Sequence, residues 1–427
     1  MPSTLPAYVA DPLLLASRYR DVRALTLALT QSLSAEDQCI QSMPDASPSK
    51  WHMAHTTWFF EVVVLRAHVQ DYRPFDPRYF HLFNSYYESL GSRHPRPQRG
   101  MLSRPSLEEV LRYRAHVDAA MLALLEGDQS TGAGWVPLVE LGLNHEQQHQ
   151  ELLLTDIKHA FSLNPLLPAW GKAPQVAAVL PVGGSWQGYQ GGEVLVGHGA
   201  GGFAFDNETP RHRIYLQPYA LARQLVSNGD YLAFIEDGGY RRPELWLSEG
   251  WATVQAQGWR APAYWLEQEG LRTQFTLYGE RALDLAEPVC HLSFYEAAAY
   301  AAWAGARLPT EFEWEVAAAS QATGAPPAGM SLASLDPHPR AAGEGEGLQQ
   351  LFGAVWQWTR SSYDPYPRFQ PLAGAVGEYN GKFMVGQLVL RGGSCATPAG
   401  HSRASYRNFF PPTARWQFSG LRLARDL

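Results

Sequence analysis

Two histidines stand four positions apart in the stretch LGLNHEQQHQELLL, residues 141–154. On an α-helix, residues four apart differ by about 40° around the axis, so His145 and His149 can bind one metal ion from the same face. The letters also match the His-Glu-x-x-His signature of zinc metalloproteases, in which the glutamate, here Glu146, is the general base. The stretch therefore predicts a metal site, and it leaves open which metal is bound and for which chemistry.

A third ligand has to come from another segment. Glu151 lies about 120° around the helix from His145 and is a poor candidate, whereas the segment SPSKWHMAHTTWFFE offers His52 and His55. Without a metal, His145 and His149 would lie on a solvated helix face, and His52 and His55 would be packed in the core. The occurrence of two histidine pairs, each on a long helical segment, favours metal binding instead. Three neutral imidazoles with open positions suit iron(II), although imidazole also suits zinc and copper.

A zinc protease is the less favoured interpretation. The extended signature of one protease class requires glycine and histidine downstream, and Leu152 and Thr155 occupy those positions. A second class uses a distant glutamate as a ligand, and the spacing leaves that class open. Neither class continues into a second half of the kind found in this chain.

These histidines lie on two of four amphipathic segments. The four segments together predict a four-helix bundle, a fold that builds metal sites from facing helices. The segments, with a longer connection after the second, are residues 11–33, 47–68, 106–127 and 135–161. Asp11 and Ser47, each followed by proline, are expected N-caps, and Ser106 with Glu109 is an expected capping box.

The texture changes after the Pro-rich stretch LNPLLPAWGKAP, residues 163–174. Short strands, glycine turns and irregular loops follow. We therefore expect an α+β protein with a four-helix bundle at residues 1–163, a linker at 164–178 and an irregular α+β domain at 179–427.

Composition and charge narrow the functional classes. The chain has 427 residues, of which 45% are hydrophobic and 18% charged, as in core-forming globular proteins. A net charge of -7 without a long basic run argues against a nucleic-acid partner. No apolar stretch approaches the roughly 20 residues that span a membrane, and no signal peptide is recognisable. The three cysteines, Cys39, Cys290 and Cys395, suit a reducing compartment, so we expect a cytoplasmic protein.

Seven motifs, in order along nearly the whole chain, resemble those of the ergothioneine-biosynthesis sulfoxide synthases. They are SPSKWHMAHTTWFFE, FNSYYESLGSRHPRPQRG, NHEQQHQE, DNETPRHRIYL, GARLPTEFEWE, LRGGSCATP and YRNFFPPTARWQFSGLRLARD. The resemblance implies a DinB-like four-helix bundle followed by a domain of the formylglycine-generating-enzyme (sulfatase-modifying-factor) type, which has a C-type-lectin-like fold.

In that family three histidines hold a non-haem iron, and the resemblance places them at His55, His145 and His149. These enzymes join cysteine sulfur to C2 of the imidazole of hercynine (trimethylhistidine), consume O2 and leave the sulfur as a sulfoxide. The double tyrosine and the RHPRPQRG segment resemble the branch that uses free cysteine rather than a γ-glutamyl dipeptide. The resemblance therefore implies an Fe(II)-dependent hercynine oxygenase whose partners are small molecules: hercynine, cysteine or a related sulfur or selenium donor, and O2.

The resemblance also implies roles for residues near the metal. A tyrosine hydroxyl there can donate a proton or a hydrogen bond, and this catalytic role falls on Tyr86 and Tyr87. Without the resemblance, a Tyr-Tyr pair is interpreted more simply as packing. Gln148, which flanks the metal-binding face, can hydrogen-bond the hercynine imidazole or carboxylate.

Two groups of side chains are expected to bind the charged ends of the substrates. A trimethylammonium group has no proton to donate and requires aromatic faces and oxygen dipoles, which the family's substrate loop supplies here with Asn408, Phe409, Phe410 and Trp416. The carboxylate of the sulfur donor calls for a guanidinium. The candidates are Arg93, Arg96 and Arg99.

Several related activities share parts of this pattern. A selenoneine synthase, which joins a selenosugar to hercynine, remains an open alternative, whereas ovothiol enzymes usually carry an added methyltransferase domain that these residues do not contain. Formylglycine-generating enzymes act through two neighbouring cysteines, and Cys290 and Cys395 are 105 residues apart. A non-catalytic module would bind a metal or small cation without O2 turnover.

Overall fold

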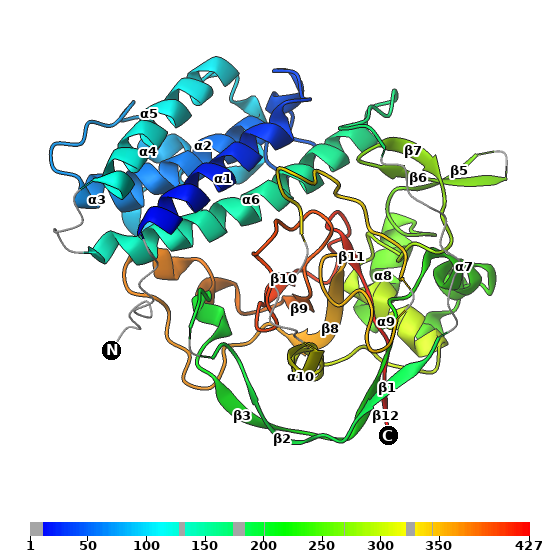
Figure 1. The fold of residues 1–427 in the computed structure, drawn as a ribbon. Helices are drawn as coiled ribbons and strands as arrows, with labels where there is room; N and C mark the ends of the chain where they lie inside the picture. Colours follow the sequence, from blue (N-terminus) through cyan, green and yellow to red (C-terminus); the bar gives the residue numbers. More distant parts are fainter. Residues whose placement is uncertain are drawn as a thin grey trace.

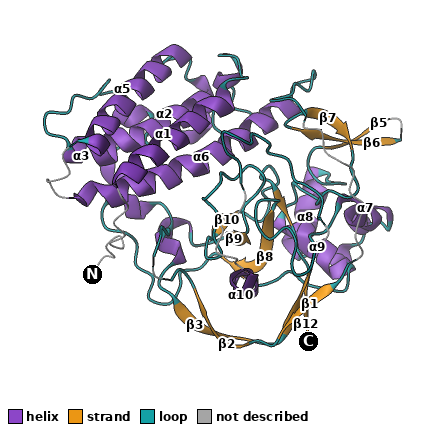
Figure 2. Cartoon of the chain, viewed as in Figure 1, coloured by secondary structure: helices purple, strands orange, loops and turns teal. Residues whose placement is uncertain are grey.

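The computed structural model describes residues 12–127, 133–173, 184–199, 201–268, 270–321, 329–343 and 345–427. A group of long helices lies beside a mixed region of short strands and helices (Figure 1). Figure 2 shows the long helices gathered on one side of the molecule and the strands on the other. In the described residues, the long helices come from the first part of the chain and the strands from the second. The expected α+β class is confirmed.

Four long helices form the predicted bundle: α1 (Pro12–Thr30), α2 (Ser49–Phe59), α5 (Leu107–Glu126) and α6 (Val136–Ser162). Helices α5 and α6 each pack against both α1 and α2. Their facing sides bury a core rich in aromatic side chains, which includes Tyr19, Trp58, Phe60, Tyr113 and Met121. Within the described part of the chain, no helix has the length and apolar character that crossing a membrane requires.

The helix starts agree with the sequence in one place and differ in another. Ser106 and Glu109 form the expected capping box on α5. Ser47 does not cap α2, because its hydroxyl accepts a hydrogen bond from Arg99 Nη1 at 2.9 Å and the helix begins after Pro48. The Ser47 hydroxyl oxygen, which would otherwise accept a backbone N–H of the first helical turn, accepts the guanidinium of Arg99 instead. The cap expected at Asp11 lies outside the described residues.

The second helix does not stop at Phe59. It continues through a π-helical turn, Phe60–Leu65, into the short helix α3 (Arg66–His68). The turn buries Glu61, whose carboxylate accepts hydrogen bonds from the hydroxyls of Tyr72 at 2.9 Å and Tyr113 at 2.8 Å. Glu61 thereby fixes the start of the connection 69–106, which contains helix α4 (Tyr79–Leu82) and the predicted tyrosines and arginines.

Short strands form the framework of the second half. One sheet has the order β10-β9-β8-β11, in which β8, β9 and β10 are antiparallel neighbours and β11 runs parallel to β8. Its strands are β8 (Trp356–Ser362), β9 (Leu388–Arg391), β10 (Asn408–Phe410) and β11 (Ser419–Gly420). This sheet lies below helix α6 in Figure 1, and its strand β10 contains Asn408, Phe409 and Phe410 of the predicted substrate loop.

Three further sheets and four helices complete this half. One sheet joins β1 (Trp186–Tyr189), β4 (Tyr219–Ala222) and β12 (Ala424–Asp426). The others are the pair β2 (Gly192–Val196) and β3 (His212–Leu216), and the meander β5 (Trp265–Gln268), β6 (Leu271–Thr276) and β7 (Gly279–Ala282). The helices are α7 (Asn228–Glu236), α8 (Ser248–Gln257), α9 (Phe294–Trp303) and α10 (Glu311–Gln321).

Helix α6 joins the two halves. Glu151 accepts hydrogen bonds from Trp356 Nε1 at 2.7 Å, from Thr397 Oγ1 at 2.9 Å and from the Ser394 hydroxyl. One hydrophobic cluster contains residues of both halves, among them Leu25, Leu153, Phe275 and Val355. The bundle and the second half therefore share a core.

The predicted linker, residues 164–178, is described as far as residue 173. Its Trp170 is buried, donates from the backbone N–H to Leu277 O at 2.7 Å, and donates from the indole Nε1 to Leu29 O at 2.8 Å. Trp170 thus connects α1 to the β6–β7 turn. The Pro-rich composition indicated a linker, but this part of it is packed.

Candidate functional site

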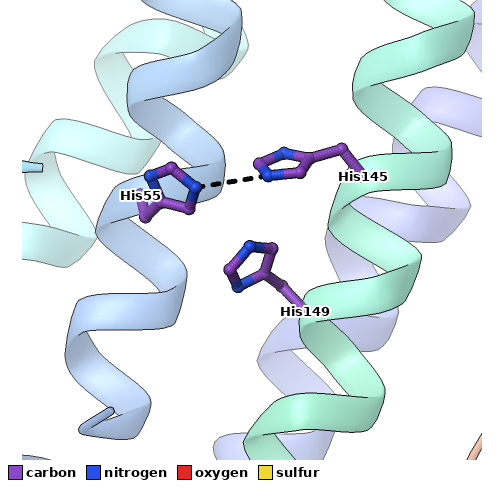
Figure 3. Close-up of side chains that lie close together, drawn as sticks. All are labelled: His55, His145 and His149. Atoms are coloured by element: carbon purple, nitrogen blue, oxygen red, sulfur yellow. Dashed lines mark hydrogen bonds between the residues drawn. The ribbon is translucent and has the colours of Figure 1, made fainter. Parts of the chain in front are cut away.

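Three histidines from two facing helices converge at the centre of the bundle (Figure 3). His55 lies on α2, and His145 and His149 lie one turn apart on α6. One nitrogen from each ring lies within 4.8 Å of the others, and His55 Nε2 is 3.2 Å from His145 Nε2. Among the described residues, no carboxylate or thiolate joins this group. The site fits a divalent transition metal bound by three imidazoles with open coordination positions.

Hydrogen bonds on the far side of two rings fix which nitrogen can bind the metal. His55 Nδ1 donates to Phe83 O at 2.7 Å, so the lone pair of that ring is at Nε2. His52 lies 3.0 Å from Asp156 Oδ2 through Nε2 and 2.8 Å from His149 Nδ1 through Nδ1. His52 Nε2–H donates to Asp156, so His52 Nδ1 carries the lone pair and accepts a hydrogen bond from His149 Nδ1–H. The lone pair of His149 is then at Nε2, which can bind a metal. His52 therefore supports a ligand rather than being one.

Burial keeps the three imidazoles neutral. Loss of solvation lowers the pKa of His145 to about 4. It also lowers the pKa values of His55 and His149 well below their ordinary value, with further lowering by the neighbouring histidines. Neutral imidazole is the form that ligates a metal, so no proton has to be displaced at neutral pH.

Glu146 faces away from the three histidines, into the bundle. Its carboxylate accepts hydrogen bonds from Arg23 Nη1 at 2.9 Å, from Arg114 Nη2 at 2.6 Å and from Thr26 Oγ1 at 2.6 Å. Burial alone would raise its pKa, but the two guanidinium groups and these hydrogen bonds lower it to about 2. A carboxylate held in this way cannot take a proton from a metal-bound water. The chain thus lacks the general base of a His-Glu-x-x-His protease at this position.

A cavity of about 240 Å³ lies where the bundle meets the second half. Its lining includes predicted residues from both halves: Tyr86, Arg96, Gln148, Asn408, Phe409, Phe410 and Trp416. A much smaller cavity of about 20 Å³ is lined by His145 and Tyr87, and it shares Gln148, Tyr379 and Asn380 with the larger one. His145, one of the three histidines that we call the metal group, therefore faces the space between the two halves.

The predicted tyrosines and Gln148 take distinct places around this space. Tyr86 is partly buried and lines the larger cavity, whereas Tyr87 is buried and stacks on Trp58 with the ring centroids 5.6 Å apart. Gln148 Nε2 donates to the Tyr406 hydroxyl at 2.8 Å. Gln148 Oε1 is buried and has no hydrogen-bond partner among the described residues. A ligand in the cavity can donate to it.

The three residues of β10 all line the larger cavity, but not equally. Phe409 stacks on Tyr363 with a centroid distance of 4.0 Å, so one of its faces is covered. Asn408 Oδ1 accepts a hydrogen bond from the Phe409 backbone N–H at 2.9 Å. Phe410 meets Trp416 edge-on at 6.1 Å. Phe410 and Trp416 form an aromatic corner in the cavity wall.

The three candidate arginines differ in where their guanidinium groups lie. Arg96 lines the cavity and lies 3.4 Å from the Tyr86 hydroxyl through Nη1. Arg93 is exposed, pairs with Glu88 at 2.7 Å and does not line the cavity. Arg99 is buried with its guanidinium 3.4 Å above the ring of Trp51.

The sequence did not point to four aromatic residues of the second half that line the site: Phe205, Tyr379, Phe383 and Tyr406. Tyr379 lies 6.4 Å from His145 between ring centroids, and Tyr406 binds Gln148. Tyr379 and Phe383 belong to an irregular segment without periodicity or a recognisable motif. A signal was available for Tyr406, which opens the motif that contains the predicted substrate loop and lies two residues before Asn408.

Cys290 and Cys395 are both buried in the hydrophobic cluster shared by the two halves. Burial raises the pKa of Cys290 to about 12 and also raises that of Cys395. Neither thiol lines the cavity beside the metal group. The two cysteines are structural in this fold and are not arranged for cysteine-based catalysis.

Comparison with known families assigns both halves. Residues 18–153 match the DinB superfamily, and residues 188–331 and 326–427 match the sulfatase-modifying factor enzyme 1-like domain. These matches confirm the expected order of a DinB-like bundle and a formylglycine-generating-enzyme-like domain.

Full-length relatives are similar throughout. A hercynine oxygenase of Mycolicibacterium smegmatis is 35% identical over 98% of this chain and 99% of its own length. That of Mycobacterium tuberculosis is 34% identical over 98% of this chain and all of its own length. A formylglycine-generating enzyme of Streptomyces coelicolor is 30% identical but matches 48% of this chain and 76% of its own length. Similarity that continues through the bundle, the metal group and the cavity shows that the chain belongs to the hercynine oxygenase family and is an oxygenase.

Proposed function

We propose that this protein is a cytoplasmic, Fe(II)-dependent sulfoxide synthase that joins the sulfur of cysteine to C2 of the hercynine imidazole. Its family makes it an oxygenase of ergothioneine biosynthesis. The observation that carries the proposal is the group of three neutral, buried imidazoles beside a cavity lined by both halves. Iron bound by His55, His145 and His149 would supply the electron that activates O2 and favour the thiolate form of the donor. The four electrons that reduce O2 to the sulfoxide oxygen and one water would come from the two substrates, two from C–S bond formation and two from oxidation of the sulfur.

Hercynine fits the inner part of the cavity. Gln148 Oε1 has no partner among the described residues and can accept the imidazole N–H. The trimethylammonium group cannot donate a hydrogen bond and is attracted to aromatic faces. Phe410 and Trp416 offer such faces in the same cavity, with the amide of Asn408 beside them. These contacts would orient C2 of the imidazole toward the metal group.

Arg96 is the residue we propose as the anchor for the cysteine carboxylate. It alone of the three candidate arginines lines the cavity, and its Nε is buried without a partner among the described residues. Arg93 is already engaged by Glu88 and by Ser85 O at 3.1 Å. A guanidinium that lacks a carboxylate partner is well suited to bind one in a bidentate manner.

The tyrosines would supply protons and hydrogen bonds. Burial raises the pKa values of Tyr87 and Tyr379 well above the ordinary value, so both hydroxyls stay protonated at neutral pH. Both side chains line the small cavity with His145, and Tyr86 lines the larger cavity nearby. We propose Tyr86 and Tyr87 as catalytic residues, joined by Tyr379 from the second half.

We also propose the division into a bundle at 1–163, a linker at 164–178 and a second domain at 179–427. The family matches end and begin close to these bounds, which supports them. The packing of Trp170 against both halves supports a fixed arrangement of the described part of the linker, residues 164–173.

The test is O2 consumption by the Fe(II)-loaded protein with hercynine and cysteine, with products identified by mass spectrometry. Omission of each substrate, replacement of Fe(II) by Zn(II), and the donors γ-glutamylcysteine and a selenosugar form the other arms. We expect uptake that requires both substrates and yields hercynyl-cysteine sulfoxide. A product formed only with the selenosugar would establish the selenoneine alternative. Absence of uptake with every donor, despite one bound iron, would refute the proposal.

Variants of the arginines test the donor site. We expect Arg96→Met to raise the KM for cysteine about 10- to 100-fold, because a charged hydrogen-bond partner is lost, and to leave the KM for hercynine close to wild type. Arg93→Met is the matched control, since its guanidinium lies outside the cavity. If Arg93→Met instead raised the KM for cysteine, Arg96 would not be the anchor.

A further inference from the structure

An irregular segment of the second half covers the tyrosine turn of the bundle. The segment contains two short 3-10 helices, Ala375–Glu378 and Gly381–Phe383. The first contacts the 3-10 helix Glu88–Leu90, which directly follows Tyr86 and Tyr87. These residues are almost 300 positions apart in sequence, so the contact exists only because the two halves dock.

Two charged side chains of this segment bind the backbone of the turn. The Glu378 carboxylate accepts the N–H of Glu88 through Oε2 and that of Ser89 through Oε1, each at 3.0 Å. The Lys382 ammonium donates to the carbonyl oxygen of Tyr86. Glu378 and Lys382 also lie 3.6 Å from one another. Backbone groups on both sides of Tyr87 are thus held by one ion pair.

The neighbouring residues of the same segment touch the tyrosine side chain. The ring of Tyr379 is 6.0 Å and that of Phe383 is 5.3 Å from the ring of Tyr86. Tyr379 directly follows Glu378, and Phe383 directly follows Lys382. The segment therefore alternates between residues that hold the turn and residues that line the cavity.

The turn has a second anchor within the bundle. Asn84 Oδ1 accepts the Tyr87 N–H at 3.1 Å, and Asn84 Nδ2 donates to Tyr87 O at 3.0 Å. This anchor fixes Tyr87 from inside, whereas Glu378 and Lys382 hold Tyr86 and the two residues after Tyr87 from outside. Removal of the outer pair would leave Tyr87 held by Asn84 and would leave the carbonyl of Tyr86 with only the Glu88 N–H, at 3.0 Å, as a partner among the described residues.

We propose that Glu378 and Lys382 are positioning residues that fix the Tyr86–Tyr87 turn against the cavity from across the two halves. The inference rests on the proposed function, because it assigns catalysis to that turn. Neither side chain lines the cavity. Both act through the backbone of the turn, so they set the geometry of the hydroxyls without touching a substrate.

The chemistry of the pair suits this task. Partial burial would raise the pKa of Glu378, but hydrogen bonds from Ser89 and Glu88 lower it below its ordinary value, so the carboxylate is charged. Hydrogen bonds to an ionised acceptor are roughly twice as strong as neutral ones. The side chains are 24% and 35% exposed, so their replacement opens no internal cavity and the variants should fold.

The test compares Glu378→Ala, Lys382→Met and Lys382→Arg with wild type, all loaded with Fe(II). We expect kcat for sulfoxide formation to fall about 10- to 100-fold in Glu378→Ala, the range that a displacement of catalytic groups by about 1 Å produces. The amount of sulfoxide per O2 consumed should fall as well, with iron content and the KM for cysteine near wild type. Lys382→Met should show a smaller loss, and Lys382→Arg should restore most of it. Glu280→Ala is the matched control, because Glu280 is an exposed carboxylate that binds Thr273 on β6.

Hydrogen exchange separates this inference from the proposed function. The backbone amide of Ser89 should exchange faster in Glu378→Ala than in wild type, even if the wild type has a different substrate. The amide of Glu88 should change less, because it also donates to Tyr86 O at 3.0 Å. Unchanged exchange would show that Glu378 does not hold the turn. Faster exchange with wild-type kcat and wild-type product per O2 would show that the turn needs no positioning, which overturns the inference as well.

Discussion

Glu146 provides the sharpest test of how the His-Glu-x-x-His letters should be interpreted. In a protease, Glu146→Gln would remove the general base and leave stability almost unchanged. In this structure, the same change removes the only carboxylate that pairs with both Arg114 and Arg23 among the described residues. Glutamine keeps the shape and one acceptor oxygen, so the loss is one of charge.

Two independent estimates give the size of the effect. Removal of one partner from a buried ion pair costs about 3–5 kcal/mol, because the remaining charge stays buried. The pKa of Glu146 falls from its ordinary 4.5 to about 2, and this difference corresponds to about 3 kcal/mol of stability at neutral pH. We therefore expect Glu146→Gln to lower the free energy of unfolding by about 3 kcal/mol.

The pH dependence has a definite sign. Because the folded-state pKa is depressed, the stabilisation by Glu146 is fully present above about pH 4.5 and is lost as the pH falls toward 2. The stability difference between wild type and Glu146→Gln should therefore be largest near pH 7 and should shrink below pH 4.5.

The assay is urea unfolding of the metal-free proteins, with the midpoint compared at equal m values. Glu126→Gln is the control within the bundle, since Glu126 on α5 pairs with Arg20 and the two side chains are 46% and 50% exposed. That variant should change stability by less than about 1 kcal/mol. Wild-type stability in Glu146→Gln, together with loss of a metal-dependent hydrolysis, would refute the reasoning and restore the role of a base.

Three further predictions concern residues around the metal and the interface. His52→Gln should weaken metal binding about 10- to 100-fold, measured by competition with a chelator, because it breaks the link from Asp156 to His149. Gly142→Ala should lower stability by about 1 kcal/mol in urea unfolding although alanine favours helices, because its Cβ would lie 2.5 Å from Phe60 Cε1. Burial lowers the pKa of Lys158 from 10.5 to about 7. Between these two pH values Lys158 is protonated in the unfolded chain and neutral in the folded protein, so stability should rise with pH. Lys158→Met should abolish the rise between pH 7 and 9 in the same measurement.

Local rules predicted the parts of the site that lie on regular helices. The spacing of His145 and His149 requires only the period of an α-helix, and the structure places both on one face. The capping box at Ser106 is equally local and is confirmed. The choice between His52 and His55 needed the family resemblance, because both lie on one helix. Packing then separates them, as His55 reaches the metal group and His52 binds Asp156.

The residues that the sequence missed depend on contacts between distant segments. Tyr379 and Phe383 belong to irregular backbone, where no period predicts which side chains point inward. The choice among the arginines of the RHPRPQRG segment has the same origin. Arg96 faces the cavity because a 3-10 helix, Arg96–Met101, orients it, whereas Arg99 of the same helix stacks on Trp51.

Helix α6 explains why the metal group and the second half cannot be treated as separate modules. His145 and His149 point toward His55, Glu146 points into the bundle, and Glu151 and Lys158 are buried against the second half. A polar side chain that is buried without a partner costs about 1–3 kcal/mol, and a charged one costs more. The polar side chains on different faces of α6 therefore need partners, and these partners come from different parts of the chain. Together they fix both the rotation and the position of the helix. The second half does more than cover the cavity, because its contacts with Glu151 and Lys158 help to determine where the two histidine ligands stand.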